Sequence, residues 1–100
     1  MWDIELTKQA VKDLKLIRAA GFGDKTHSLI EVLQRDPLSP IPSYEALAGN
    51  LSGCYSRRIN RQHRLVYELH QDPHERKGVQ YEGTVRILRM WTHYEGLGRR

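Results

Sequence analysis

Apolar and polar residues alternate at the start of the chain, which predicts a short strand over residues 2–6. Thr7 can then cap a helix, because a threonine hydroxyl accepts a hydrogen bond from a free amide of the first turn. Gly21 and Gly23 are expected to end this helix. The apolar positions expected on its buried face are Val11, Leu14 and Ile17.

A second helix is predicted to follow, with Asp24 as its cap. It should stop by Asp36, because Pro37 disfavours helical geometry in the residue before it. So short a turn between two helices predicts an antiparallel helical hairpin. The buried stripe expected on the second helix consists of Leu29, Ile30 and Leu33.

The pattern of apolar and polar residues in the second half of the chain predicts strands. Residues 37–43 contain three prolines and should form a stiff connector, and residues 44–49 are expected to form one helical turn or an ordered loop. A turn at 60–62 and a long exposed hairpin loop at 71–83 separate the strands. The last strand is apolar on both faces, which is typical of the middle of a sheet. The strands are predicted at 54–59, 64–70 and 84–92.

This order predicts an α+β fold, in which an N-terminal strand and a helical hairpin pack on a small, mainly antiparallel four-stranded sheet. We expect one domain over residues 1–100, with a loose tail at 95–100. The sequence has no apolar run of about 18 residues and no signal peptide, so no membrane contact is expected. Cys54 is the only cysteine, which excludes an internal disulfide and fits a cytoplasmic location.

Positive charge is concentrated in one segment. The net charge is +4, and residues 46–66 carry four arginines and no acidic residue, so the rest of the chain is neutral. Such a concentration favours a protein that meets phosphates, although a solvated arginine face has the same composition. The arginines are Arg57, Arg58, Arg61 and Arg64.

The sequence carries no phosphate-binding loop, no dinucleotide fingerprint and no nucleophile elbow. Its five histidines lack the paired spacing of a zinc site, so neither a metal nor another cofactor is expected. The remaining candidates for catalysis are Glu45, the arginines and the pair His93-Tyr94. Metal-free RNA cleavage uses the ribose 2′-hydroxyl as nucleophile and needs a base, a cation for the transition state and an acid. A carboxylate, a guanidinium and an imidazole supply these groups.

Four motifs together resemble one family. They are Asn50-Leu51-Ser52-Gly53, Ser56-Arg57-Arg58-Ile59, His63-Arg64-Leu65-Val66-Tyr67 and His93-Tyr94. In this combination the chain resembles the YoeB branch of the RelE/ParE toxin superfamily, the toxins of type II toxin–antitoxin systems. The resemblance covers most of the chain and is closest from Tyr44 to Tyr67.

The resemblance implies a ribosome-dependent endoribonuclease that cuts mRNA in the decoding site and so inhibits translation. The family's catalytic glutamate falls on Glu45, which would be the general base, and its arginine falls on Arg64, which would hold the transition state. The terminal histidine and tyrosine fall on His93, the general acid, and on Tyr94, which would position or stack on RNA.

Further residues are expected to bind RNA. Arg57 and Arg58 would hold backbone phosphates, or one of them would instead be buried in a structural ion pair. The sequence also departs from the family pattern: Cys54 replaces an aromatic residue, the 71–83 hairpin is longer than usual, and the chain continues past Tyr94. The other residues expected to bind RNA are Tyr55, Arg61 and His63.

The resemblance also implies partners: the ribosome with its mRNA, and a YefM-like antitoxin whose acidic, partly disordered C-terminal segment covers the basic site. Operator DNA is expected to bind only the toxin–antitoxin complex, and a homodimer is a further partner found in close relatives. Three alternatives stay open, since a fold alone does not fix function. They are a non-catalytic module that binds RNA or the ribosome, a toxin of the same fold that inhibits gyrase, and an inert member that acts as a repressor component.

Overall fold

The computed structural model describes residues 1–91. Its elements follow the predicted order, with additional short strands. They are β1 (Asp3–Leu6), α1 (Lys8–Ala19), α2 (Gly23–Arg35), β2 (Glu45–Ala46), a 3-10 turn η1 (Gly49–Leu51), β3 (Cys54–Arg58), β4 (Arg64–His70), β5 (His74–Arg76), β6 (Val79–Tyr81) and β7 (Thr84–Arg89).

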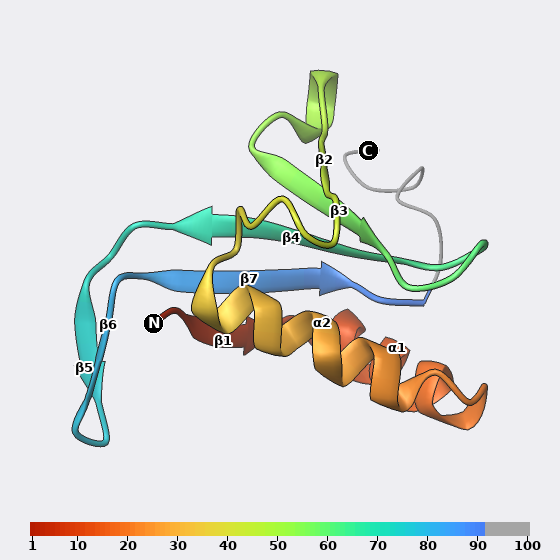
Figure 1. Ribbon diagram of the computed structural model, residues 1–100, viewed down its shortest axis with the longest axis horizontal. Helices are drawn as coiled ribbons and strands as arrows, with labels where there is room; N and C mark the ends of the chain where they lie inside the picture. The colour runs from red at the N-terminus through yellow and green to blue at the C-terminus, as the bar shows by residue number, and fades with distance from the viewer. Residues whose placement is uncertain (92–100) are drawn as a thin grey trace.

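Five strands form the main sheet in the order β1-β7-β4-β3-β2. Only β1 and β7 are parallel, and the other pairs are antiparallel, so the predicted mainly antiparallel α+β fold is confirmed. The strand β7 lies inside the sheet, as its two apolar faces predicted. The fifth strand, β2, stands where one helical turn or an ordered loop was expected. Strands β5 and β6 form a separate hairpin that projects from one end of the molecule (Figure 1).

The first helix begins as predicted but buries a different face. The Thr7 hydroxyl accepts a hydrogen bond from the amide of Ala10 at 3.0 Å, which confirms the cap. The buried residues of α1 are Ala10, Asp13 and Ile17, whereas Val11 is 44% exposed. The expectation for Val11 was therefore wrong, because the helix turns a charged residue, rather than this valine, toward the sheet.

The second helix ends as predicted but starts differently. Phe22 occupies the position before its first turn, and no side chain caps the helix there. Asp24 lies within the first turn, where its charge favours the positive end of the helix without capping it. Leu29 and Leu33 are buried as expected, while Ile30 is partly buried. Asp36 closes the helix.

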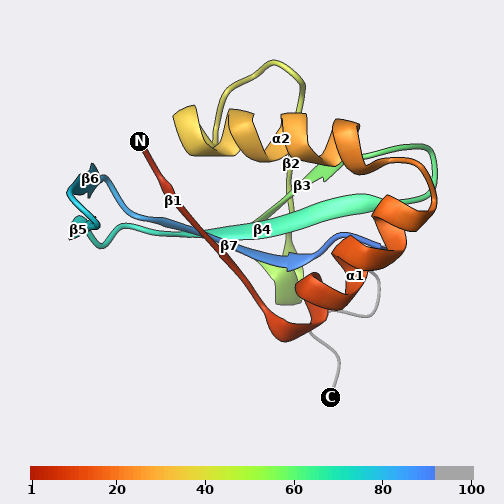
Figure 2. The same cartoon turned by 90° about the horizontal axis from the view of Figure 1, so that it is seen from below.

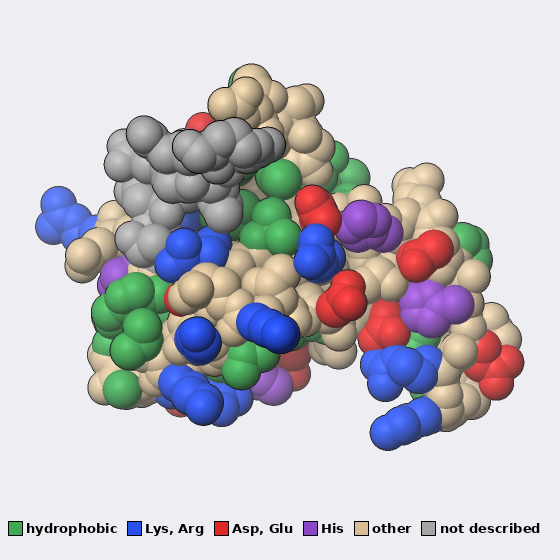
Figure 3. Space-filling view, turned by 180° about the vertical axis from the view of Figure 1, so that it is seen from behind, with side chains coloured by type: hydrophobic (Ala, Val, Ile, Leu, Met, Phe, Trp, Pro, Cys, Tyr) green, Lys and Arg blue, Asp and Glu red, His purple; other side chains and the backbone are tan. Residues whose placement is uncertain are grey.

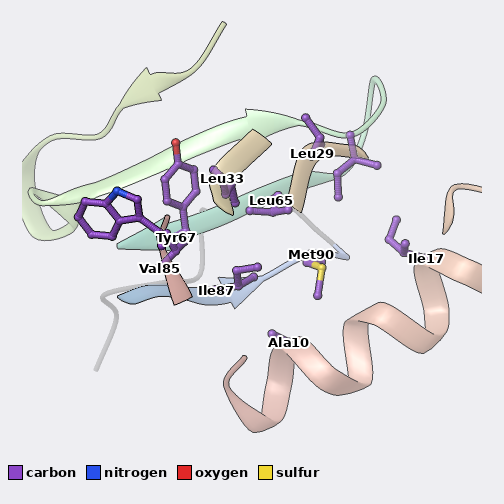
Figure 4. Close-up of a cluster of buried hydrophobic side chains, with 11 residues drawn as sticks. Ala10, Ile17, Leu29, Leu33, Leu65, Tyr67, Val85, Ile87 and Met90 are labelled. Atoms are coloured by element: carbon purple, nitrogen blue, oxygen red, sulfur yellow. The ribbon is translucent and has the colours of Figure 1, made fainter. Parts of the chain in front are cut away.

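The two helices run in opposite directions beside the sheet, which confirms the predicted hairpin (Figures 1 and 2). Their buried residues join side chains of the central strands in one cluster (Figure 4). The residues of β4 and β7 in this cluster belong to one face of the sheet, because side chains on a strand alternate between its two faces. We call this side the helix face. It comprises Leu65, Tyr67, Val85 and Ile87, packed on Ala10, Ile17, Leu29 and Leu33.

The opposite side of the sheet, which we call the open face, holds a smaller apolar cluster. Leu47, Cys54 and Val66 are buried there, with Leu51 and Leu88 packed against them. Burial raises the pKa of the Cys54 thiol, and the nearby Glu68 carboxylate adds to this effect, so the thiol stays protonated near neutral pH. No helix within residues 1–91 is long and apolar enough to cross a membrane.

Candidate functional site

The strand pairing brings the predicted base and the predicted transition-state arginine to the same side of the sheet. Residues paired directly across antiparallel strands share a face. Glu45 pairs with Ser56, Ser56 pairs with Val66, and Arg58 pairs with Arg64. Because Val66 belongs to the open face, this face also receives Glu45, Arg58 and Arg64.

These side chains differ in exposure. Glu45 and Arg58 are exposed and Arg64 is half-buried, so a carboxylate and two guanidinium groups border the apolar cluster of the open face. A carboxylate can accept a proton, and a guanidinium can hold two phosphate oxygens at once. The arrangement can therefore act on a phosphodiester that lies across β2, β3 and β4.

Arg57 lies on the other side of the sheet, although it is next to Arg58 in the chain. Its side chain is 1% exposed. It donates hydrogen bonds to the Tyr67 hydroxyl at 3.1 Å and to the carbonyl oxygens of Pro37 at 2.9 Å and Ser39 at 3.0 Å. It also donates to the carbonyl of Pro42. These bonds occupy the guanidinium, so its position does not fit the expected contact with RNA phosphates.

Arg57 is the buried arginine that the alternative interpretation anticipated, but no carboxylate partners it among the contacts of residues 1–91. Its acceptors are carbonyl oxygens of the proline-rich connector, and the ring of Tyr44 lies 5.1 Å from the guanidinium carbon. The arginine thus fixes this connector to β3. Burial raises the pKa of the Tyr67 hydroxyl, an effect that hydrogen bonding from Arg57 partly offsets, so Tyr67 stays protonated.

Two more residues expected to bind RNA lie on the helix face. Tyr55 is half-buried and its ring packs edge-on against Tyr44 at 5.7 Å. His63 is 6% exposed, and its ring stacks on Trp91 at a centroid distance of 4.1 Å. Arg61 is exposed in the turn between β3 and β4. Of the predicted RNA-binding set, Arg58 alone joins Glu45 and Arg64 on the open face.

The predicted acid, His93, and its neighbour Tyr94 lie outside the described residues, as does the 95–100 tail. The strand that leads toward them is fixed by a buried ion pair. Asp13 accepts hydrogen bonds from the Arg89 side chain at 2.7 Å and from the Met90 amide at 3.0 Å. Burial raises the pKa of Asp13, but these hydrogen bonds outweigh it and the pKa is lowered overall. This pair was not predicted from the sequence, where its signal is the position of Asp13 on the same helix stripe as Ala10 and Ile17.

The hairpin at 71–83 was expected to be an exposed loop, but it is attached to β1. Asp3 accepts hydrogen bonds from Arg76 at 2.8 Å and from His74 at 3.0 Å. The Arg76 bonds, together with His74, hold the pKa of Asp3 well below its usual range. The pKa of His74 is raised by its bond to the Asp72 carbonyl and by Asp3. Figure 3 shows this lobe at the right, with histidine, acidic and basic side chains.

Within residues 1–91, no group of three or more His, Cys, Asp or Glu side chains is arranged to hold a metal ion.

The family model described as "YoeB-like toxin of bacterial type II toxin-antitoxin system" matches residues 6–94. The chain belongs to this YoeB family of toxins. The membership that the motifs indicated is therefore confirmed.

Relatives with determined structures share the YoeB fold over most of their length. The toxin in the YoeB–YefM complex from Staphylococcus aureus is 30% identical, with a TM-score of 0.70 over 94% of this chain and 99% of that one. The YoeB/ParE toxin from Agrobacterium tumefaciens reaches a TM-score of 0.76 over 92% of this chain and 99% of that one. At 22% identity, the latter supports the fold alone.

Sequence similarity to curated YoeB toxins is concentrated in a shorter segment. The toxin YoeB of Mycobacterium bovis is 54% identical over 44 residues, which is 44% of this chain and 52% of that protein. The toxin YoeB of Escherichia coli is 44% identical over 48 residues, or 48% of this chain and 57% of that protein. The chain thus aligns with about half the length of these curated relatives.

Proposed function

We propose that this YoeB-family toxin is a ribosome-dependent endoribonuclease that cuts mRNA in the decoding site and thereby stops translation. The observation that carries the proposal is the strand register that places Glu45, Arg58 and Arg64 on the open face. Glu45 is exposed there, which leaves its carboxylate accessible to a substrate.

In the proposed reaction, Glu45 takes the proton of a ribose 2′-hydroxyl, and the 2′-oxygen attacks the adjacent phosphorus. The bond from phosphorus to the 5′-oxygen breaks, the leaving oxygen takes a proton from His93, and a 2′,3′-cyclic phosphate forms. Arg64 holds the charge that develops on the phosphate oxygens, and Arg58 holds a neighbouring phosphate. Tyr94 positions the RNA. The need for a 2′-hydroxyl makes RNA, and not DNA, the substrate.

The proposed partners follow from the same surface. An exposed carboxylate and arginines beside the apolar residues Leu47, Leu51 and Leu88 suit an antitoxin segment that carries acidic and apolar side chains. The Staphylococcus aureus relative forms a complex with YefM. We propose a YefM-like antitoxin for this chain, with operator DNA bound only by the toxin–antitoxin complex, a homodimer as the free form and a cytoplasmic location.

The test is to map mRNA 5′ ends by primer extension after the protein is added to programmed ribosomes. Glu45→Ala should slow cleavage by about 10²–10⁴-fold, because a general base contributes that much. Arg64→Ala should slow it by about 10²–10³-fold, as expected for a lost transition-state contact. The matched controls Glu31→Ala and Arg35→Ala change exposed residues of α2 and should cut normally.

The outcomes separate the alternatives. Cuts in the decoding-site codon that disappear in folded Glu45→Ala and Arg64→Ala support the endoribonuclease. Intact mRNA on ribosomes that bind the wild-type protein would contradict it and favour a non-catalytic binding module. Neither cutting nor ribosome binding would also contradict it, and supercoiling by gyrase would then be assayed.

A further inference from the structure

A pocket of about 460 Å³ opens at the end of the molecule where the two helices join and where β3 turns into β4. It is distinct from the open face, because Phe22 and Trp91 in its lining pack against the core of the helix face. The proposed function assigns no role to this pocket. Its lining consists of Ala20, Phe22, Asn60, Arg61, Gln62, His63 and Trp91.

Two stacked rings form part of the pocket wall. The planes of His63 and Trp91 are inclined by 18°, and their centroids are 4.1 Å apart. Phe22, at the start of α2, contributes a third aromatic ring to the lining. Aromatic faces of this kind bind planar ligands by stacking. The pocket therefore suits a flat, aromatic group better than a flexible aliphatic one.

The imidazole of His63 contributes a flat ring to the pocket wall. The residue is 6% exposed, and its Nδ1 atom has no hydrogen-bond partner within the part of the chain that the structure describes. This atom is itself closed to solvent, so the ring contributes its face to the pocket and not a hydrogen bond.

The rim of the pocket is rigid and positively charged. The Asn60 side-chain oxygen accepts hydrogen bonds from the amides of Gln62 at 2.8 Å and His63 at 2.6 Å, which fixes the turn. Arg61 is exposed on this turn and can reach a phosphate next to a bound ring. Stacking faces and a nearby guanidinium are two features that suit a nucleotide.

We propose that this pocket binds a nucleobase of the RNA substrate, one that flanks the cleaved phosphate. The inference rests on the proposed function and adds a base subsite to it. His63 lines the pocket, and Arg64, the next residue in the chain, lies on the open face. The two surfaces therefore adjoin at consecutive residues. The base stacks on the aromatic lining of the pocket, and Arg61 holds its phosphate. The subsite gives the enzyme a preference for a base at one position near the cut.

The test measures binding of a short 2′-O-methyl oligoribonucleotide, which cannot be cut because its 2′-oxygens are blocked. Anisotropy titrations compare the intact oligonucleotide with versions that lack one base at each position in turn. Wild-type protein should lose about 5- to 150-fold in affinity when the stacked base is missing, since stacking contributes about 1–3 kcal/mol per base. In Trp91→Leu the same missing base should cost less than about 2-fold.

The matched control is Trp2→Phe, which changes the other tryptophan, buried in the main core and outside the pocket lining. It should keep the full penalty for the missing base. If Trp91→Leu does not fold, the ring resonances of His63 in wild-type protein serve instead. They should shift when the intact oligonucleotide is added and stay in place with the oligonucleotide that lacks the critical base.

Three results would overturn the subsite. The first is that intact and base-deleted oligonucleotides bind equally well or do not bind at all. The second is that the missing base costs the same affinity in wild type and in Trp91→Leu. The third is that the His63 resonances respond only to an acidic apolar peptide. Cleavage on ribosomes that depends on Glu45 and Arg64 would then leave the proposed function intact. If cleavage is absent while the base-dependent binding is found, the subsite stands and the nuclease proposal fails.

Discussion

Arg57 and Arg58 are consecutive residues of β3 with opposite surroundings. Arg57 points to the helix face, is 1% exposed and donates to carbonyl oxygens and a tyrosine hydroxyl. Arg58 is exposed on the open face opposite Arg64. The face of the strand on which an arginine side chain lies therefore decides whether it stabilises the fold or is accessible to a ligand.

The two faces differ in the same way beyond these arginines. On the helix face, Arg57 and Tyr67 form a closed polar network over the apolar core. On the open face, the buried hydroxyl of Ser56 has no hydrogen-bond partner in residues 1–91, and the neighbouring Glu45 is exposed. A satisfied network stabilises a fold, whereas exposed charged groups such as Glu45 and Arg58 remain available to a ligand. Variants that act on one face at a time test this difference.

The largest effect is expected from Arg57→Ala. The change leaves carbonyl oxygens of the connector and the Tyr67 hydroxyl without their donor, so the free energy of unfolding should fall by about 3–5 kcal/mol. Arg58→Ala, the matched control one residue away, should change it by less than about 0.5 kcal/mol. Urea unfolding at pH 7 measures both. Equal stability of the two variants would show that the faces are not specialised in this way.

Arg64→Lys should reduce cleavage. Lysine keeps the charge but cannot hold two phosphate oxygens with one planar group. Losing one hydrogen bond to a charged group, at about 1.5–3 kcal/mol, corresponds to a cleavage rate lower by about 10- to 100-fold. Single-turnover cleavage on programmed ribosomes, beside Arg35→Lys, measures it. Full activity in Arg64→Lys would mean that charge alone matters at this position.

The sequence predicted the arrangement of elements better than their contacts. Periodicity located both helices and the central strand β7, because burial of one face is a repeating property of the chain. It failed at Val11, since Asp13 takes a buried place on the helix through its bonds to Arg89 and Met90. It also missed β2, whose two residues are too few to show an alternating pattern.

The candidate site was predictable in part for a similar reason. The family motifs indicated Glu45 and Arg64, and the strand register then placed them on one face. The motifs did not separate Arg57 from Arg58, because the burial of Arg57 depends on carbonyl groups of the connector, some 15 to 20 residues away in the chain. The composition gives the number of arginines, but only the fold shows which guanidinium groups already donate to acceptors within the protein.

Asp13→Asn should lower the stability of the protein at neutral pH but not in acid. The pKa of Asp13 is lowered in the folded protein, so its carboxylate contributes stability above the unfolded pKa that is lost as pH falls through the folded pKa. At pH 7 the variant should be less stable by about 1.5–3 kcal/mol, the worth of hydrogen bonds to a charged group. The gap should narrow below about pH 4. Urea midpoints from pH 7 to 2.5 measure it, with exposed Asp24→Asn as control, and a constant gap would contradict the prediction.

The smallest effect is expected from Ser56→Ala, which removes a hydroxyl on the open face. The Ser56 side chain is 1% exposed and its oxygen has no partner among the described residues, so alanine should leave stability unchanged or raise it by about 1 kcal/mol. Ser39→Ala is the control, because the Ser39 hydroxyl donates to the Ile41 carbonyl at 3.0 Å and its loss should not stabilise. Thermal unfolding measures both variants. Because Ser56 pairs with Glu45, cleavage is measured as well. A loss of stability in Ser56→Ala would show that the hydroxyl is satisfied in solution, and a loss of cleavage alone would show that it helps to position the paired Glu45.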